Sequence, residues 1–170
     1  IKRPRTNQFR EGDYLIGISS NGLHTNGFTE VRRVFGAEWR SEFVVPSYDY
    51  LDTILALDEK FDIHAMMHIT GGAFTKLKHS LNNIDVLINN DHKLDPHKIF
   101  FELYEQGISD EEMYKIFNCG IGFILSVNRE DAGNVINEIR DFKADIVGEV
   151  IKGDGKVKIR SKFSKKVVEY

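Results

Sequence analysis

Residues 14–28 read Tyr-Leu-Ile-Gly-Ile-Ser-Ser-Asn-Gly-Leu-His-Thr-Asn-Gly-Phe, an apolar run followed by a turn rich in glycine, asparagine and serine. The apolar residues 14–19 predict a buried strand, and residues 29–35 predict a short helix after the turn. Gly22 and Gly27 let the backbone turn tightly and approach a ligand, while the following helix presents unpaired N–H groups at its start. The stretch therefore predicts a strand–loop–helix unit whose loop can hold an anion.

Length and composition favour one globular domain. The chain has 170 residues, of which 41% are hydrophobic, enough for one full core but short for two typical domains. We therefore expect a single domain over residues 1–170. Its 23 Lys and Arg residues nearly balance 26 Asp and Glu residues, for a formal charge of -3. No broad positive field draws such a chain to nucleic acid or to an anionic membrane surface.

The cysteine, histidine and aromatic residues outside the glycine-rich segments favour structural roles. Cys119 is the chain's one cysteine, and we expect it to be a buried apolar group rather than a nucleophile. His79, His92 and His97 lack metal-ligand spacing, so we predict no metal site. Core packing is the expected role, ahead of a stacking platform, for a group of aromatic residues. They are Phe35, Trp39, Phe43, Tyr48 and Tyr50.

The cysteine content and the lack of long apolar runs also bear on location. A lone cysteine fits a reducing cytoplasm, and no apolar run approaches the roughly 20 residues that cross a bilayer. The chain begins at Ile1, without an initiating methionine or a signal-peptide core. We therefore expect a cytoplasmic protein and a chain that forms part of a longer one.

The remaining elements alternate between helices and strands. Periodicity and capping residues predict helices at residues 51–61, 96–106, 109–116 and 131–142, and strands at 84–88, 123–127, 145–151 and 156–160. The turn Lys-Gly-Asp-Gly at 152–155 predicts that the last two strands form a hairpin. The order predicts an α/β (α+β) fold with a mixed β-sheet covered by helices.

Basic residues gather at the two ends of the chain, and we expect both groups to be solvated tails. They are Lys2, Arg3, Arg5 and Arg10 at one end and Lys156, Lys158, Arg160, Lys162, Lys165 and Lys166 at the other.

Two further glycine-centred segments carry candidate chemistry. In the first, His68 and Thr70 precede the pair at residues 71–72, which predicts N–H groups and a hydroxyl around an anion, with His68 able to exchange a proton near neutral pH. In the second, Asn118 precedes two glycines and a strand. The structural alternatives are a tight strand-to-helix turn with backbone-bonded histidines for the first segment, and a bulge or a close helix–strand contact for the second.

Taken in order, three segments resemble the C-terminal domain of aminoimidazole ribonucleotide synthetase. They are residues 12–28, 62–72 and 113–122, and Asp-Ile-Val-Gly-Glu-Val at 145–150 also fits. The resemblance covers nearly the whole chain, and three motifs at compatible distances make chance similarity improbable.

The resemblance implies the cyclisation step of purine biosynthesis, in which formylglycinamidine ribonucleotide and ATP give aminoimidazole ribonucleotide, ADP and phosphate. It implies that ATP and Mg²⁺ are held mainly by an N-terminal domain outside this chain, which also makes the main contact of a homodimer. His68 would be catalytic, facing the reacting end. The implied substrate-binding residues are Ser20, Asn21, Gly22, His24, Asn26, Gly27, Thr70, Gly71, Gly72 and Asn118.

Two departures from the family pattern leave the exact substrate open. Residues 46–52 read Pro-Ser-Tyr-Asp-Tyr-Leu-Asp where the family reads Pro-Thr-Arg-Ile-Tyr-Val-Lys, and Ala73 replaces a third glycine. The same two-domain architecture serves formylglycinamide ribonucleotide amidotransferase, selenophosphate synthetase, thiamine monophosphate kinase and a hydrogenase maturation factor. A stand-alone ligand-binding or regulatory module is the alternative from a different class.

Overall fold

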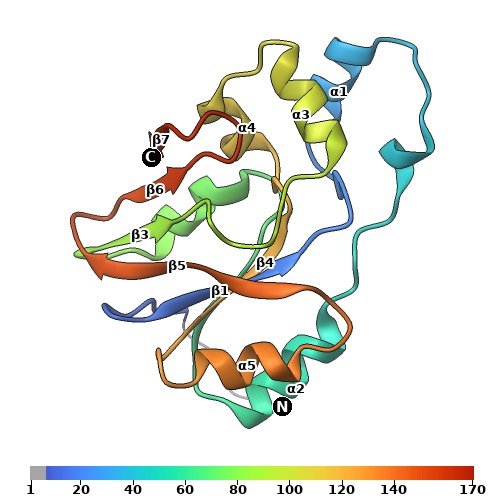
Figure 1. Cartoon of the computed structure of the whole chain (residues 1–170). Coiled ribbons are helices and arrows are strands. Elements are labelled where there is room, and N and C mark those ends of the chain that lie inside the picture. The colour runs from blue at the N-terminus through green and yellow to red at the C-terminus, as the bar shows by residue number, and fades with distance from the viewer. Residues whose placement is uncertain (1–6) are drawn as a thin grey trace.

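A computed structural model describes residues 7–170, and a mixed seven-stranded sheet in this part of the chain organises the fold (Figure 1). The strands are β1 (Tyr14–Ser19), β2 (Ile63–His68), β3 (Ile84–Ile88), β4 (Ile121–Val127), β5 (Ala144–Lys152), β6 (Val157–Arg160) and β7 (Val167–Glu169). Their order in the sheet is β2-β4-β1-β5-β3-β6-β7, in which β3 and β6 are parallel and the other neighbouring pairs are antiparallel.

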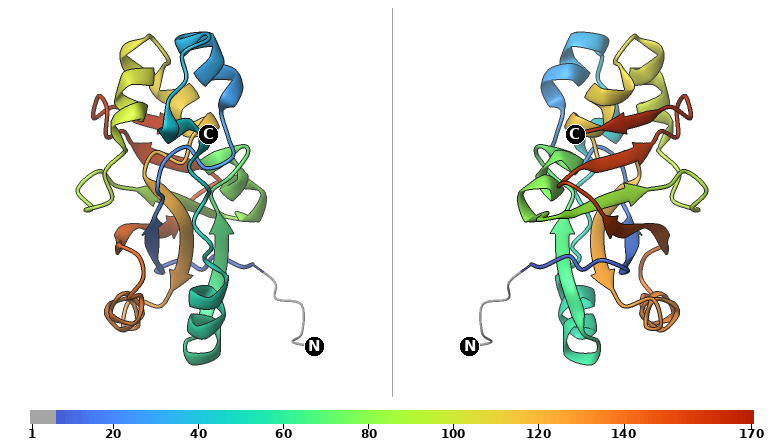
Figure 2. Two further views of the ribbon diagram at one scale, coloured as in Figure 1. Left: turned by 90° about the vertical axis from the view of Figure 1, so that its right-hand side faces the viewer. Right: turned by 90° about the vertical axis from the view of Figure 1, so that its left-hand side faces the viewer.

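Helices cover both faces of this sheet, as Figures 1 and 2 show. The helices are α1 (Phe28–Phe35), α2 (Leu51–Lys60), α3 (Lys98–Glu105), α4 (Asp110–Ile116) and α5 (Ala132–Glu138), with 3₁₀ helices η1 (Ser41–Val44) and η2 (Ala73–Ser80). Because side chains alternate along a strand, Leu15 of β1 packs into a core with α1, α3, α4 and η2, whereas Ile16 packs into a second core with α2 and α5. The predicted fold class, a mixed sheet covered by helices, is confirmed.

Most predicted elements are present within a few residues of their expected ends. The α5 helix stops at Glu138 instead of continuing to residue 142, because the backbone turns extended at Ile139. Strands β2 and β7 and the short helix η1 were not predicted as elements. Among residues 7–170, no helix is long and apolar enough to cross a membrane.

The prediction that the strands now labelled β5 and β6 form a hairpin is wrong. Strand β3 lies between β5 and β6, pairing antiparallel with the first and parallel with the second. The Asp85 carboxylate accepts hydrogen bonds from the backbone N–H groups of residues 154, 155 and 156 at 2.8, 3.1 and 2.9 Å. These bonds anchor the connection between β5 and β6 to the start of β3. Strands β5 and β6 therefore do not pair with each other.

The C-terminal basic residues are not a solvated tail, which corrects a second prediction. Strands β6 and β7 belong to the sheet, and Lys158 pairs with Asp85 at 2.8 Å. Lys162 pairs with Asp95 at 2.8 Å and has an exposed side-chain fraction of only 12%. Of the N-terminal group, Arg10 pairs with Asp62 at 3.7 Å, and Lys2, Arg3 and Arg5 lie outside the described residues.

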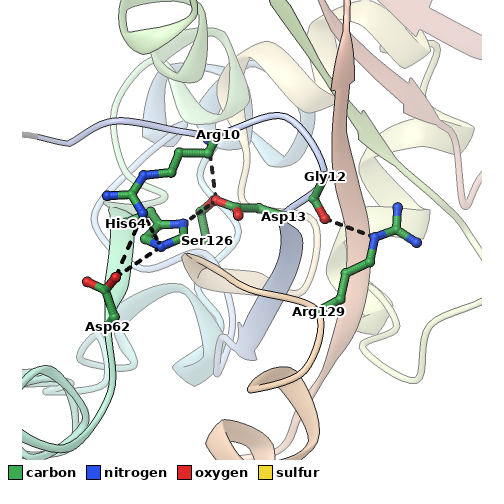
Figure 3. Close-up of polar contacts among 7 residues, drawn as sticks. All are labelled: Arg10, Gly12, Asp13, Asp62, His64, Ser126 and Arg129. Atoms are coloured by element: carbon green, nitrogen blue, oxygen red, sulfur yellow. Dashed lines mark hydrogen bonds and ion pairs between the residues drawn. The ribbon is translucent and has the colours of Figure 1, made fainter.

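A buried polar cluster joins β1, β2 and β4 at one end of the sheet (Figure 3). The Oδ2 atom of Asp13 receives the Ser126 hydroxyl at 2.6 Å and lies 2.8 Å from Nδ1 of His64. Arg10 Nη1 lies 2.6 Å from the other ring nitrogen of His64. Ser126 donates to the carboxylate rather than to the histidine and is fully buried, so this trio is a structural tie and not a nucleophilic triad.

The variant Ser126→Ala is expected to lower the free energy of unfolding by about 1 kcal/mol, because it removes one hydrogen bond to a buried carboxylate that keeps its other partners. Urea denaturation at pH 7 measures this difference. An unchanged midpoint would show that the hydroxyl adds nothing to the tie.

Candidate functional site

The loop between β1 and α1 carries His24 into the interior. His24 has a left-handed backbone, φ 56°, and only 2% of it is exposed. Gly27 ends the loop with φ 81°, and a Cβ at this position would lie 2.0 Å from the Phe117 ring. The glycine is therefore required both for the turn and for close packing against the segment that follows α4.

Asn118 holds this loop in place. Its Oδ1 atom accepts the Ser20 hydroxyl at 2.7 Å and the Gly120 N–H at 3.0 Å, while its Nδ2 atom donates to the Gly22 carbonyl at 2.8 Å. The third glycine-centred segment thus clamps the first. Both ends of the Asn118 amide are engaged inside the protein, and direct contact of Asn118 or Ser20 with substrate stays a prediction.

Three rings meet where this loop approaches the end of β2. The centroid of His24 lies 6.0 Å from His68 and 6.2 Å from Tyr50, and Tyr50 lies 5.5 Å from His68. Phe123 of β4 stacks on His68 at 5.7 Å. The tyrosine hydroxyl donates to the carbonyl of Ser19 at 2.8 Å, which ties the segment before α2 to the end of β1. The structure therefore brings the two predicted histidines together.

The His24 ring is buried and the His68 ring is half-buried, and three of their ring nitrogens are buried without a hydrogen-bond partner among the described residues. Both ring nitrogens of His24 and Nε2 of His68 have no hydrogen-bond partner among the described residues. Burial lowers the pKa of His24 to about 4, with further lowering by His68 and His97. Burial also lowers the pKa of His68, and the charge of Lys76 adds to this effect. Both rings are neutral at pH 7, and buried polar atoms without partners indicate a place for a ligand.

The turn after β2 joins His68 and Thr70 through Lys76, a residue that sequence reasoning missed. The Nζ atom of Lys76, from η2, donates to the His68 carbonyl at 2.9 Å and to the Thr70 hydroxyl at 2.6 Å. The glycine pair does open a helix, but a 3₁₀ helix, with Gly72 at φ 79°. Lys76 lies one turn along that helix from the glycines, and this spacing could have identified it in the sequence as a candidate site residue.

The two glycine-rich loops are also close to each other. A Cβ on Gly71 would lie 3.2 Å from the Oδ1 atom of Asn26, so the first and second loops approach at this point. Asn21 donates to the Pro46 carbonyl at 2.7 Å, while its own Oδ1 atom is buried and has no hydrogen-bond partner within residues 7–170. The predicted binding residues thus fall into one region, with Asn26 facing the second loop and Asn21 tied to the segment before α2.

A cavity of about 500 Å³ adjoins the loop. Its lining includes Ser20 and Gly120 and both basic and acidic residues. The basic ones are Lys93, His97 and Lys143, and the acidic ones are Asp95 and Asp141. His97 also lies 2.9 Å, through Nε2, from the Ser20 carbonyl, so this wall is joined to the loop.

Three residues outside the site test the remaining sequence expectations. Cys119 is buried, and burial raises its pKa well above the ordinary value, which confirms an inert apolar group. Trp39 is 74% exposed, so the prediction that it packs in the core is wrong, whereas Phe43 is buried as expected. Within residues 7–170, no group of three or more His, Cys, Asp or Glu side chains could hold a metal ion.

Comparison with known proteins identifies the family of this chain. Residues 10–160 match the family described as AIR synthase related protein, C-terminal domain. The chain is 38% identical over 141 residues to the phosphoribosylformylglycinamidine cyclo-ligase of Clostridium perfringens, covering 76% of this chain and 42% of that protein. It is 32% identical, over an alignment of 176 residues, to the protein of the same name from Methanococcus vannielii, covering 94% and 49%. The chain spans about half the length of the curated relatives it matches.

Solved structures share the fold at low sequence identity. The hydrogenase maturation protein HypE superposes with a TM-score of 0.73 at 16% identity, covering 99% of this chain and 56% of that one. The T. maritima PurL structure complexed with FGAR superposes with a TM-score of 0.59 at 12% identity, covering 97% and 28%. These likenesses concern the fold alone, whereas the family match and the identity to the cyclo-ligases confirm the resemblance. The chain therefore belongs to the family of AIR synthase related proteins, of which it carries the C-terminal domain.

Proposed function

We propose that this chain is the substrate-side domain of an ATP-dependent cyclo-ligase that converts formylglycinamidine ribonucleotide to aminoimidazole ribonucleotide in de novo purine biosynthesis. One observation supports it most: His24 is buried in the glycine-rich loop with both ring nitrogens unpaired, next to the half-buried His68. The relatives at 32% and 38% identity are named as cyclo-ligases of this kind, which supports the substrate class.

The proposed reaction mainly needs positioning and charge stabilisation. The γ-phosphoryl group of ATP passes to the formyl oxygen of the substrate, an amidine nitrogen attacks the activated carbon, and the phosphate then leaves as the ring closes. His68, neutral at pH 7, accepts the proton that the attacking nitrogen loses. His24 donates from one ring nitrogen and accepts at the other, which fixes an oxygen or nitrogen of the substrate.

The two glycine-rich loops provide the remaining substrate contacts in this proposal. The backbone at Gly22 and Gly27 and the side chains of Asn21 and Asn26 face the phosphate or ribose. Thr70, with the turn at residues 71–72, faces the reacting end. The close approach of Gly71 to Asn26 supports a single substrate bridging both loops.

The rest of the machinery is assigned to other parts of the full-length protein. Residues 1–170 form one domain, while an N-terminal domain binds most of the ATP and Mg²⁺ and makes the homodimer contact. HypE and T. maritima PurL, which share this fold, have each been solved in complex with ATP, and this supports nucleotide use by the full-length protein. We place the complete enzyme in the cytoplasm.

His24→Ala is expected to weaken binding of formylglycinamidine ribonucleotide to this chain by at least about tenfold, the effect of losing one good hydrogen bond from a buried group. Isothermal titration calorimetry measures the dissociation constant. His79→Ala, at an exposed histidine on η2, is the matched control and should bind as the wild type does. Because the pKa of His24 is about 4, wild-type binding should not weaken through His24 between pH 8 and 6.

The same titration separates the alternatives. Wild-type binding that is unaffected by magnesium ATP and lost in His24→Ala agrees with a substrate-side half-site. Binding that is equal in His24→Ala and His79→Ala removes His24 from the site. No binding of the ribonucleotide by the full-length protein would favour a regulatory module or a maturation protein of the same architecture.

A further inference from the structure

Lys76 is a half-buried cation with no carboxylate beside it. Among residues 7–170, its ammonium donates to a carbonyl and a hydroxyl, those of His68 and Thr70. None of the ion pairs found among residues 7–170 includes it. By contrast, the similarly buried Lys158 and Lys162 each pair with an aspartate. Burial lowers the pKa of Lys76, the cost expected of an ammonium that lacks a counter-charge.

The hydrogen bond from Lys76 also decides what Thr70 can offer. Since an ammonium only donates, the Thr70 oxygen must accept from Nζ at 2.6 Å. The threonine O–H proton then points away from Lys76 and is free to donate to a ligand. The backbone of the turn is fixed as well, because Ala73 N–H donates to the Thr70 carbonyl at 2.6 Å. A cation and a hydroxyl donor thus lie side by side at the start of η2.

Among the residues that the structure describes, no carboxylate is found to affect the charge of His68. Lys76 from η2 approaches it from one side, and the neutral rings of His24, Tyr50 and Phe123 lie around it, from the first loop, the segment before α2 and β4. This wall of the site therefore carries a positive charge and an unpaired ring nitrogen, a combination that suits an anionic oxygen.

We propose that Lys76 and Thr70 form an anion-binding subsite beside His68 that receives a phosphate or phosphoryl oxygen. The proposal rests on the proposed function where it takes a phosphorylated ribonucleotide or ATP as the natural source of that oxygen. The subsite itself is a property of this chain and can be tested with inorganic phosphate.

The test follows the Hε1 resonance of His68 by NMR while inorganic phosphate is added to the chain. Phosphate should shift the wild-type resonance in a saturable manner, and Lys76→Met should weaken this binding by about tenfold. Lys76→Arg should retain most of it, since the charge is kept. Lys78→Met removes an exposed lysine of the same helix and should leave binding unchanged, which separates the subsite from general surface charge.

A pH titration without phosphate gives a second readout that loss of folding does not imitate. The pKa of His68 should rise in Lys76→Met, because a positive neighbour is removed, and should stay at the wild-type value in Lys78→Met. The proposal is overturned if Lys76→Met and Lys78→Met have the same effect on phosphate binding and on the pKa of His68. It is also overturned if the wild type shows no saturable phosphate binding.

Two further ligands identify the source of the anion. Lys76-dependent binding of ribose 5-phosphate assigns the subsite to the substrate phosphate, and Lys76-dependent binding of magnesium ATP assigns it to the nucleotide; either result supports the subsite. Failure of formylglycinamidine ribonucleotide to bind, together with Lys76-dependent phosphate binding, would overturn the proposed substrate while the subsite stands.

Discussion

Asp85→Ala is expected to lower the free energy of unfolding at pH 7 by about 3 kcal/mol, because it leaves three backbone N–H groups and one ammonium without their acceptor. The Asp85 side chain is 4% exposed and accepts from Lys158 at 2.8 Å in addition to the backbone bonds of residues 154–156. The substitution weakens the connection between β5 and β6, which holds β6 beside β3. Urea denaturation followed by circular dichroism measures the change.

The control is Asp154→Ala, at an exposed aspartate of the same turn whose backbone N–H remains in place. It should alter stability by less than about 0.5 kcal/mol, as surface substitutions usually do. Equal effects of the two substitutions would show that the Asp85 carboxylate does not anchor the turn.

The contribution of Asp85 should also depend on pH. Burial alone would raise its pKa, but the bonds from Lys158, Lys156 and Asp154 outweigh burial and lower the pKa from 3.8 to about 2. When the pKa of a carboxyl is lower in the folded than in the unfolded state, the carboxyl contributes its full stabilisation to the fold above its unfolded pKa. This contribution is lost as the pH falls through the folded pKa. The stability difference between wild type and Asp85→Asn should therefore hold from pH 7 to about 5 and shrink between about pH 4 and 2.

Gly122→Ala is expected to disturb the candidate site and the fold together, lowering stability by about 2–3 kcal/mol. A Cβ on Gly122 would lie 1.9 Å from the Tyr50 hydroxyl oxygen and 2.9 Å from Cε1 of His24. Since Tyr50 is bonded to Ser19 and His24 is buried, neither ring can move without breaking the arrangement around His68. Binding of formylglycinamidine ribonucleotide should weaken by more than about tenfold in consequence.

Gly133→Ala supplies a matched control for this substitution. Gly133 lies in α5, where an added Cβ meets no atom within 4 Å. Alanine in a helix should stabilise it by up to about 1 kcal/mol. Thermal unfolding and ribonucleotide titration of both variants give the comparison, and a Gly122→Ala protein with wild-type stability and affinity would contradict the close packing of the three rings.

Local sequence was sufficient to predict those elements whose own residues indicate their structure. The apolar run at residues 14–19 is a strand of the predicted extent, and the turn after it holds His24 at a positive φ. The ring centroids of the predicted site residues His24 and His68 lie 6.0 Å apart, although the two residues are 44 positions apart in the sequence. The family resemblance, not periodicity, predicted that they belong to one site.

Other features depend on partners that no local pattern reveals. Tyr50 reads as an ordinary core aromatic, and Lys76 as one of several lysines on a polar stretch. Both enter the site because η2 and the segment before α2 bring them next to His68, at the end of β2. A glycine-containing turn at 152–155 is typical of a hairpin, yet the hydrogen bonds of Asp85 direct the chain past β3 instead.

The sequence by itself determined the alternation of strands and helices, the glycine-rich loop and the family, because these follow from short-range periodicity, backbone freedom and matching motifs. Only the tertiary structure decided the strand order, the burial of His24 without a partner and the position of Lys76 without a counter-charge. Those properties arise from contacts between residues far apart in the chain, which the sheet brings together and a linear pattern does not encode.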